Sequence, residues 1–135
     1  MLDAKIPAGY TNVTPYLVVP DVKGQIDFLR QALDAEVTFE PILRDDGSIM
    51  HAEVRVGNAL IMMGGSTDVH APIPAMLYVY VDDADDRYER ALDAGGTSLM
   101  EPSDQPHGDR YGGVQDQNGN QWYMAQRLRE VTTDE

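Results

Sequence analysis

Tyr16-Leu-Val-Val-Pro-Asp21 and Tyr78-Val-Tyr-Val-Asp-Asp83 are two copies of one pattern, in which an apolar strand leads to an aspartate. Asp21 and Asp83 lie 62 residues apart, and so do Tyr16 and Tyr78. The pair Gly57-Asn58 returns at Gly119-Asn120 with the same offset. Because the offset is constant at both ends of the unit, the sequence indicates an internal duplication.

Each copy predicts the same order of elements, a strand, a helix and three further strands. In the first helix Ile26, Leu29 and Leu33 recur at the spacing of one helical face, and Asp21 can cap its first turn. The expected elements of the first module, 12–64, are strands 13–19, 37–43, 51–56 and 59–63 and helix 22–33. Those of the second module, 74–126, are strands 76–81, 98–100, 111–116 and 121–126 and helix 84–94.

The fold class that follows is α+β, with two βαβββ modules that form a cupped mixed β-sheet in a single domain, 1–135. A linker at 65–73 joins the modules, and a tail at 127–135 follows them. One helix per module covers only one face of its sheet, so the other face has to be buried as well. Pairing of the modules, within one chain or across a homodimer, would bury part of that face and leave a cup.

The composition excludes several classes of protein. A net charge of -13 repels nucleic acid and anionic membranes. The chain has no cysteine, so it forms neither disulfides nor thiolate metal sites. No apolar stretch reaches the ~20 residues of a membrane span, and the N-terminus has no apolar signal core. We therefore expect a cytoplasmic protein.

Paired βαβββ modules are typical of the vicinal oxygen chelate superfamily, and nearly the whole chain resembles its glyoxalase-like and bleomycin-resistance-like branch. The pieces that carry the resemblance are Pro15-Tyr-Leu-Val-Val-Pro-Asp21, Met50-His-Ala-Glu-Val-Arg-Val-Gly57, Tyr78-Val-Tyr-Val-Asp-Asp83, Gly108-Asp-Arg-Tyr-Gly-Gly-Val114 and Asp116-Gln-Asn-Gly-Asn-Gln-Trp122. Enzymes of this superfamily bind a divalent ion with side chains from the first and last strands of each module. The resemblance places those ligand positions at Thr14, Ile61, Met76 and Tyr123.

The side chains at these four positions do not suit a divalent ion. Sites of this kind use His, Glu or Gln, because hard cations prefer carboxylate or imidazole donors. Thr14, Ile61 and Met76 supply no such donor, and Tyr123 could ligate only as a phenolate. The sequence therefore predicts no metal and no cofactor.

Strand alternation predicts an apolar and aromatic wall inside the cup. The first strands contribute Thr14 and Tyr16, and Met76 and Tyr78 in the second copy, and the last strands add their own side chains. The predicted ligand-binding residues are Thr14, Tyr16, Ile61, Met63, Met76, Tyr78 and Tyr123. Such a wall suits a mostly apolar small molecule, although the same side chains could fill a core or a dimer interface. Trp122 is expected on the helix side.

The other polar side chains indicate no catalytic site. His51, His70 and His107 have no spacing that would bring them together, and a role for His51 or His107 stays open. Arg55 and Arg110 are expected in internal ion pairs. No serine stands in a nucleophile elbow, and no phosphate-binding glycine loop follows a strand.

Three hypotheses for the function remain. The first is a metal-independent protein that binds a small, largely apolar or cationic organic molecule. The second is an enzyme of the same superfamily, a lyase, isomerase or dioxygenase that acts through a metal or through acid–base chemistry. The third is a non-catalytic interaction module whose cup is closed. Each would be a homodimer without nucleic acid or membrane partners.

Overall fold

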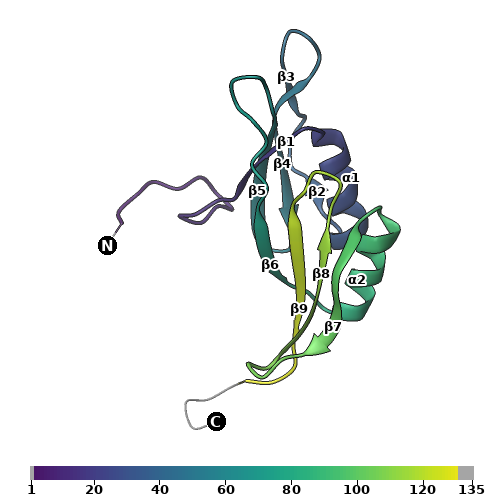
Figure 1. Ribbon diagram of the computed structural model, residues 1–135. Coiled ribbons are helices and arrows are strands. Elements are labelled where there is room, and N and C mark those ends of the chain that lie inside the picture. The colour runs from purple at the N-terminus through teal and green to yellow at the C-terminus, as the bar shows by residue number, and fades with distance from the viewer. Residues whose placement is uncertain (1, 131–135) are drawn as a thin grey trace.

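The computed structural model describes residues 2–130, and these form two βαβββ units joined by a linker (Figure 1). The first unit contains β1 (Tyr16–Val19), α1 (Val22–Leu33), β2 (Glu36–Val37), β3 (Ile42–Leu43), β4 (Ile49–Val56) and β5 (Ala59–Gly65). The second unit contains β6 (Met76–Tyr80), α2 (Ala84–Asp93), β7 (Thr97–Asp104), β8 (Asp109–Gln115) and β9 (Gln121–Arg127). The predicted order of elements is confirmed, except that the strand expected at 37–43 is split into β2 and β3.

Each unit has its own mixed sheet. The strand order is β1-β5-β4-β2 in the first sheet, where β3 also pairs with β4, and β6-β9-β8-β7 in the second. The first and last strands of each unit, β1 with β5 and β6 with β9, run parallel, and all other neighbours are antiparallel. This duplicated arrangement confirms the predicted α+β class.

Both helices begin where the sequence pattern placed them. The Asp21 carboxylate accepts a hydrogen bond from the backbone N–H of Gly24 at 3.0 Å, and Asp83 accepts one from Asp86 at 3.1 Å. These N-caps satisfy donors that the first helical turn leaves unpaired. Asp83 therefore caps α2, and Asp85 and Asp86 lie in its first turn, where acidic side chains interact favourably with the helix dipole.

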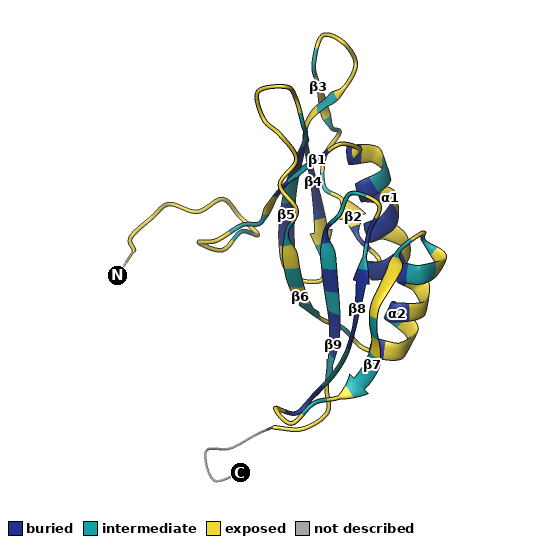
Figure 2. Ribbon diagram, viewed as in Figure 1, coloured by how far each residue is buried: buried dark blue, intermediate teal, exposed yellow. Residues whose placement is uncertain are grey.

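The core lies between the helices and the sheets. Both helices lie on the same side of the sheets, and their buried residues point toward the strands (Figures 1 and 2). Trp122 of β9 is fully buried and packs against Phe28 of α1 with ring centroids 6.4 Å apart. Trp122 therefore lies on the helix side, as predicted, and helps to join the two units.

A buried carboxylate also joins the units. Asp116, at the end of β8, accepts hydrogen bonds from Gln25 Nε2 of α1 at 2.7 Å and from Trp122 Nε1 at 2.8 Å. Its other oxygen accepts the backbone N–H groups of Asn118 and Asn120. Because Gln25 comes from the first unit, this network connects the two halves of the duplication.

Neither α1 nor α2 has the length and apolar character of a membrane-spanning helix, within the residues that the structure describes.

Candidate binding site

In the second sheet, the exposed aromatic side chains lie on the face that points away from the helices. Alternation along β6 directs Leu77 and Val79 toward the helices, whereas Tyr78 and Tyr80 lie on the opposite face and are 46% and 61% exposed. The register pairs Tyr78 with Tyr123 of β9, so Tyr123 shares this face.

Four tyrosines on this face contact one another edge to face. Ring centroids lie 5.5 Å apart for Tyr78 and Tyr80, 5.6 Å for Tyr78 and Tyr111, and 5.8 Å for Tyr111 and Tyr123. The interplanar angles of 76–84° are those that aromatic quadrupoles favour. We call these four residues the tyrosine face.

Small residues of the same sheet make room for the rings. Ala125 pairs with Tyr80 on one side and with Tyr111 on the other. Gly113 pairs with Tyr123, and a Cβ atom at Gly113 would lie 2.6 Å from Cε1 of that ring. Glycine is therefore needed at 113 for the Tyr123 ring to lie across the sheet.

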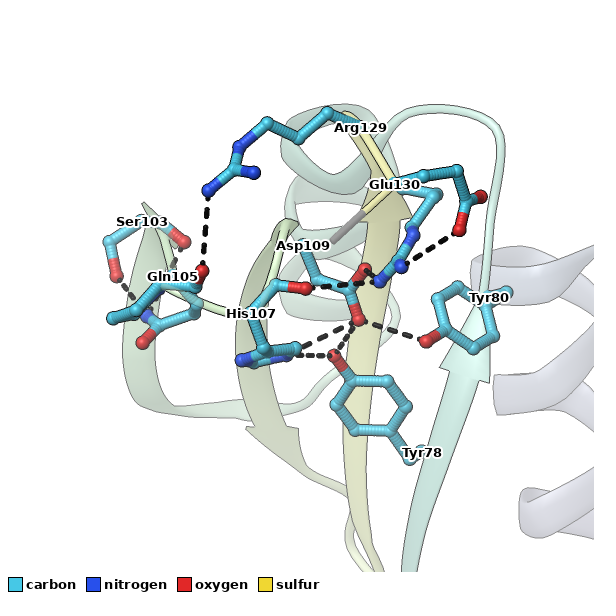
Figure 3. Close-up of polar contacts among 10 residues, drawn as sticks. Tyr78, Tyr80, Ser103, Gln105, His107, Asp109, Arg129 and Glu130 are labelled. Atoms are coloured by element: carbon cyan, nitrogen blue, oxygen red, sulfur yellow. Dashed lines mark hydrogen bonds and ion pairs between the residues drawn. The ribbon is translucent and has the colours of Figure 1, made fainter. Parts of the chain in front are cut away.

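A buried carboxylate fixes two of the hydroxyl groups (Figure 3). Asp109, whose side chain is fully buried, accepts hydrogen bonds through Oδ2 from the hydroxyls of Tyr78 at 2.6 Å and Tyr80 at 2.9 Å. Its Oδ1 accepts a hydrogen bond from Arg127 Nη1 at 3.0 Å. His107 Nε2 lies 3.3 Å from Asp109 Oδ2 and 3.3 Å from the Tyr78 hydroxyl.

These contacts shift the pKa values of the groups involved. Burial raises the pKa of Asp109, but the hydrogen bonds from Tyr78, Arg127 and Tyr80 outweigh it and lower the value to about 2. Burial and the hydrogen bond to Asp109 raise the pKa of Tyr78, and the same hydrogen bond is the largest cause of the raised pKa of Tyr80. Both phenols therefore stay protonated and Asp109 stays ionised near neutral pH.

The corresponding face of the first sheet is partly covered by the chain itself. The Tyr10 hydroxyl donates a hydrogen bond to Glu53, which is buried. His51 stacks against Phe39 with ring centroids 6.0 Å apart, and its Nδ1 lies 3.4 Å from the Tyr16 hydroxyl. The two units therefore differ: Tyr10 reaches onto the face of the first sheet, whereas the face of the second sheet carries four contacting tyrosines.

The structure brings together only part of the predicted ligand-binding set. Met76, Tyr78 and Tyr123 share the open face of the second sheet. Tyr16 lies on the corresponding face of the first sheet, and Thr14 precedes β1 beside a small hollow of about 130 Å³.

The predicted orientation of Ile61 and Met63 is wrong. Both belong to the hydrophobic core on the helix side, and Met62 is the residue of β5 that pairs with Tyr16. The error comes from the constant offset of 62 residues. In the parallel pairs Tyr16 faces Met62 and Tyr78 faces Tyr123, so equivalent positions in β5 and β9 are 61 apart. Gly57 and Gly119 lie in connections of different length, so they are not equivalent positions and do not align the strands that follow them. A slip of one residue moves every side chain of a strand to the other face.

Sequence reasoning missed Asp109 and Tyr111 as members of this site. The strand expected at 111–116 begins at Asp109 in the structure. Extending its alternation back from Tyr111 by two residues would have placed Asp109 on the tyrosine face. The predicted ion pairs exist, since Arg110 contacts Asp85 and Asp104, and Arg55 contacts Glu36.

The residues of this site do not suit a divalent metal. No three His, Asp or Glu side chains converge as a metal site anywhere in residues 2–130. The positions implied by the resemblance hold a threonine, an isoleucine, a methionine and a tyrosine, and the Ile61 side chain points into the core. Metal-ion chemistry of the kind implied by the resemblance thus has no competent donor set at these positions.

A cleft of about 760 Å³ runs along the outer edge of β6. One wall of the cleft is lined by the consecutive residues 77–81, and the opposite wall includes the turn at Gly57-Asn58. Because consecutive residues of a strand alternate between its two faces, a wall that contains all of them is the edge of the strand. Ala75 and Val81 form backbone hydrogen bonds to β9. In a parallel ladder the alternate residues Met76, Tyr78 and Tyr80 then direct their backbone N–H and C=O groups away from β9, on the side of the strand where Tyr78 and Tyr80 line the cleft.

Comparison with known proteins establishes the family. The sequence profile of the Glyoxalase/Bleomycin resistance protein/Dioxygenase superfamily matches residues 9–124. The "Uncharacterized protein Mb0911c" of Mycobacterium bovis is 35% identical over 134 residues, which cover 91% of this chain and 88% of that protein. For Rv0887c of Mycobacterium tuberculosis the identity is also 35%, over 91% of this chain and 78% of that protein.

Solved structures show the same fold. TioX from Micromonospora sp. ML1 matches with a TM-score of 0.71 and 21% identity, over 87% of this chain and 99% of TioX. A glyoxalase-related enzyme from Fulvimarina pelagi matches with a TM-score of 0.65 and 19% identity, over 87% of this chain and 88% of that enzyme. The duplicated βαβββ architecture, the match over residues 9–124 and the mycobacterial relatives together show that this chain belongs to the Glyoxalase/Bleomycin resistance protein/Dioxygenase superfamily.

Proposed function

We propose that this chain is a small-molecule-binding protein that holds a largely apolar organic molecule against the tyrosine face without a divalent metal. The observation that carries this proposal is the cluster of four contacting tyrosine rings on the sheet face that points away from the helices, where Tyr78 and Tyr80 are exposed. Exposed aromatic surface of this kind is typical of binding sites.

The rings are also held in place before a ligand arrives. Asp109 fixes the hydroxyls of Tyr78 and Tyr80, and Gly113 leaves the space in which the Tyr123 ring lies. Side chains that are already ordered lose little conformational entropy on binding. This preorganisation supports a binding role for the face, in addition to any role in packing.

A thermal-shift screen of aromatic and heterocyclic compounds tests the proposal. We expect compounds that raise the melting temperature, since a ligand at 100 times its dissociation constant stabilises a protein by about 2.7 kcal/mol. For such a compound, Tyr123→Ala should weaken binding by about tenfold or more, because one buried aromatic contact is lost.

Met50→Ala is the matched control, since it shortens an exposed apolar side chain of the first unit. Its affinity for the same compound should equal that of the unchanged protein. Equal affinity in the Tyr123→Ala variant would place the site elsewhere. Conversion of a bound compound, seen by mass spectrometry and lost in His107→Gln, would favour an acid–base enzyme, which the contact of His107 with Asp109 makes the second candidate.

We also propose that a second copy of the chain covers the outer edge of β6. Within residues 2–130 no strand pairs with this edge of β6, its residues 77–81 line the cleft, and Met76 beside them is 69% exposed. Strand edges of this kind pair readily with another chain, and a twofold pair would bring two tyrosine faces together.

Light scattering should therefore report twice the chain mass of 14.9 kDa. Met76→Pro should shift the population toward monomer, because it removes a backbone N–H that points to the cleft and leaves the hydrogen bonds to β9 intact. A protein that stays monomeric at high concentration would refute this mode of assembly.

A further inference from the structure

We propose that the ligand of the tyrosine face carries a protonated amine or amidine, and that this group binds at the hydroxyl oxygens of Tyr78 and Tyr80. This inference rests on the proposed function and names the chemical class of the ligand. Its basis is the direction of the hydrogen bonds around Asp109 (Figure 3).

The two hydroxyl protons are already committed. Asp109 is an ionised carboxylate and can only accept, so Tyr78 at 2.6 Å and Tyr80 at 2.9 Å must both be donors to it. A phenol has one proton. Neither hydroxyl therefore has a proton left for a ligand.

What these oxygens present to the open face is consequently a set of lone pairs. His107 Nε2, at 3.3 Å, can use one lone pair of Tyr78. Within residues 2–130 the hydroxyl of Tyr80 forms no hydrogen bond other than that to Asp109. The oxygens of a carboxylate, phosphate or carbonyl are themselves hydrogen-bond acceptors, so they could form no hydrogen bond with these two phenol oxygens. An ammonium or amidinium group supplies N–H donors that these two oxygens can accept.

The charges nearby favour the same class of ligand. The guanidinium of Arg127 is engaged by Asp109 at 3.0 Å, by Glu130 at 3.2 Å and by the His107 carbonyl at 3.2 Å. Asp109 itself is buried and cannot touch a ligand, but its hydrogen bonds polarise both phenol oxygens. The surrounding rings can add cation–π attraction, and the net charge of -13 favours the approach of a cation.

Three probes of equal size test this inference on the full chain: benzamidine, benzamide and benzoate. They share a phenyl ring and a planar head group, and they differ in charge and in hydrogen-bond donors. We expect ¹H–¹⁵N NMR titrations at neutral pH to show benzamidine binding about tenfold more tightly than benzamide, because its hydrogen bonds are charge-assisted. Benzoate should bind most weakly.

The double variant Tyr78→Phe/Tyr80→Phe keeps both rings and removes both oxygens. It should lose most of the preference for benzamidine over benzamide, because the rings and the net charge remain but the two acceptor oxygens do not, and the affinity for benzamide should change much less than that for benzamidine. The amide spectrum of the variant reports whether it is folded. If the double variant does not fold, the single variants Tyr78→Phe and Tyr80→Phe supply the same comparison.

The outcomes separate this inference from the proposed function. Equal affinities of the three probes at the tyrosine face, or a preference for benzoate, would overturn the cation inference and leave the binding function standing. A benzamidine preference that is undiminished in the double variant would overturn it too, since the phenol oxygens would not be its source. No shift at the tyrosine face with any probe, together with no hit in the compound screen, would count against the binding function itself.

Discussion

Replacing Asp116 by alanine is expected to lower the free energy of unfolding by about 3–5 kcal/mol. The substitution removes a buried acceptor and leaves the donors of Gln25, Trp122 and two backbone N–H groups without their partner. Each buried donor left unpaired costs about 1–3 kcal/mol, partly offset where water enters. Because Gln25 belongs to α1 and Trp122 to β9, the loss loosens the contact between the two units.

Chemical denaturation measures this loss. Asp116→Asn keeps one acceptor oxygen and should fall between the alanine variant and the unchanged chain. Asp104→Ala is the control, because Asp104 is exposed and its ion pair with Arg110 contributes at most about 1 kcal/mol. If Asp116→Ala and Asp104→Ala are equally stable, the buried network does not hold the two units together.

Gly113→Ala is expected to abolish or strongly weaken ligand binding at the tyrosine face while the protein stays folded. The added Cβ would lie 2.6 Å from Cε1 and 3.0 Å from Cδ1 of Tyr123, so the ring must leave its position. The ring can move toward the open face, and the backbone of β8 need not shift. We expect the affinity for benzamidine, or for a compound from the screen, to fall about tenfold or more.

The neighbouring glycine supplies a matched control on the other face of the sheet. A Cβ at Gly112 would lie 2.9 Å from Cγ of Pro102 and 3.0 Å from Cδ2 of Tyr88, on the helix side. Gly112→Ala should therefore cost about 1–3 kcal/mol of stability by overpacking and leave the affinity largely unchanged. The opposite result, in which Gly112→Ala loses binding and Gly113→Ala does not, would show that the tyrosine face is not the binding surface.

Much of the fold could be predicted because local signals agreed with the global arrangement. The aspartates that cap α1 and α2, the helical spacing of Ile26, Leu29 and Leu33, and the 62-residue repeat all point to one architecture. The short strands β2 and β3 were predicted as one strand. Their pairing with β4 is separate and their register shifts, which no local pattern reveals.

The candidate site was predictable where side chains alternate between polar and apolar. In β6 and β9 the tyrosines alternate with Leu77, Val79, Trp122 and Met124, so the open face could be assigned. In β5 the run Ala-Leu-Ile-Met-Met is apolar throughout, and its orientation depends on pairing with β1. Because the connections before β5 and β9 differ in length, Gly57 and Gly119 are not equivalent, and aligning the two strands through them reversed the predicted faces of Ile61 and Met63.

The amino-acid sequence alone determined the duplicated architecture, the helix boundaries and the aromatic character of one sheet face, because each depends on patterns of residues that lie close together in the chain. Tertiary structure alone decided that Asp109 lies beneath two tyrosine hydroxyls that come from a strand about 30 residues earlier. It likewise decided that Tyr10 reaches Glu53 on the face of the first sheet. Hydrogen-bond partners of this kind are set by how distant segments pack, and that packing leaves no periodic signal in the sequence.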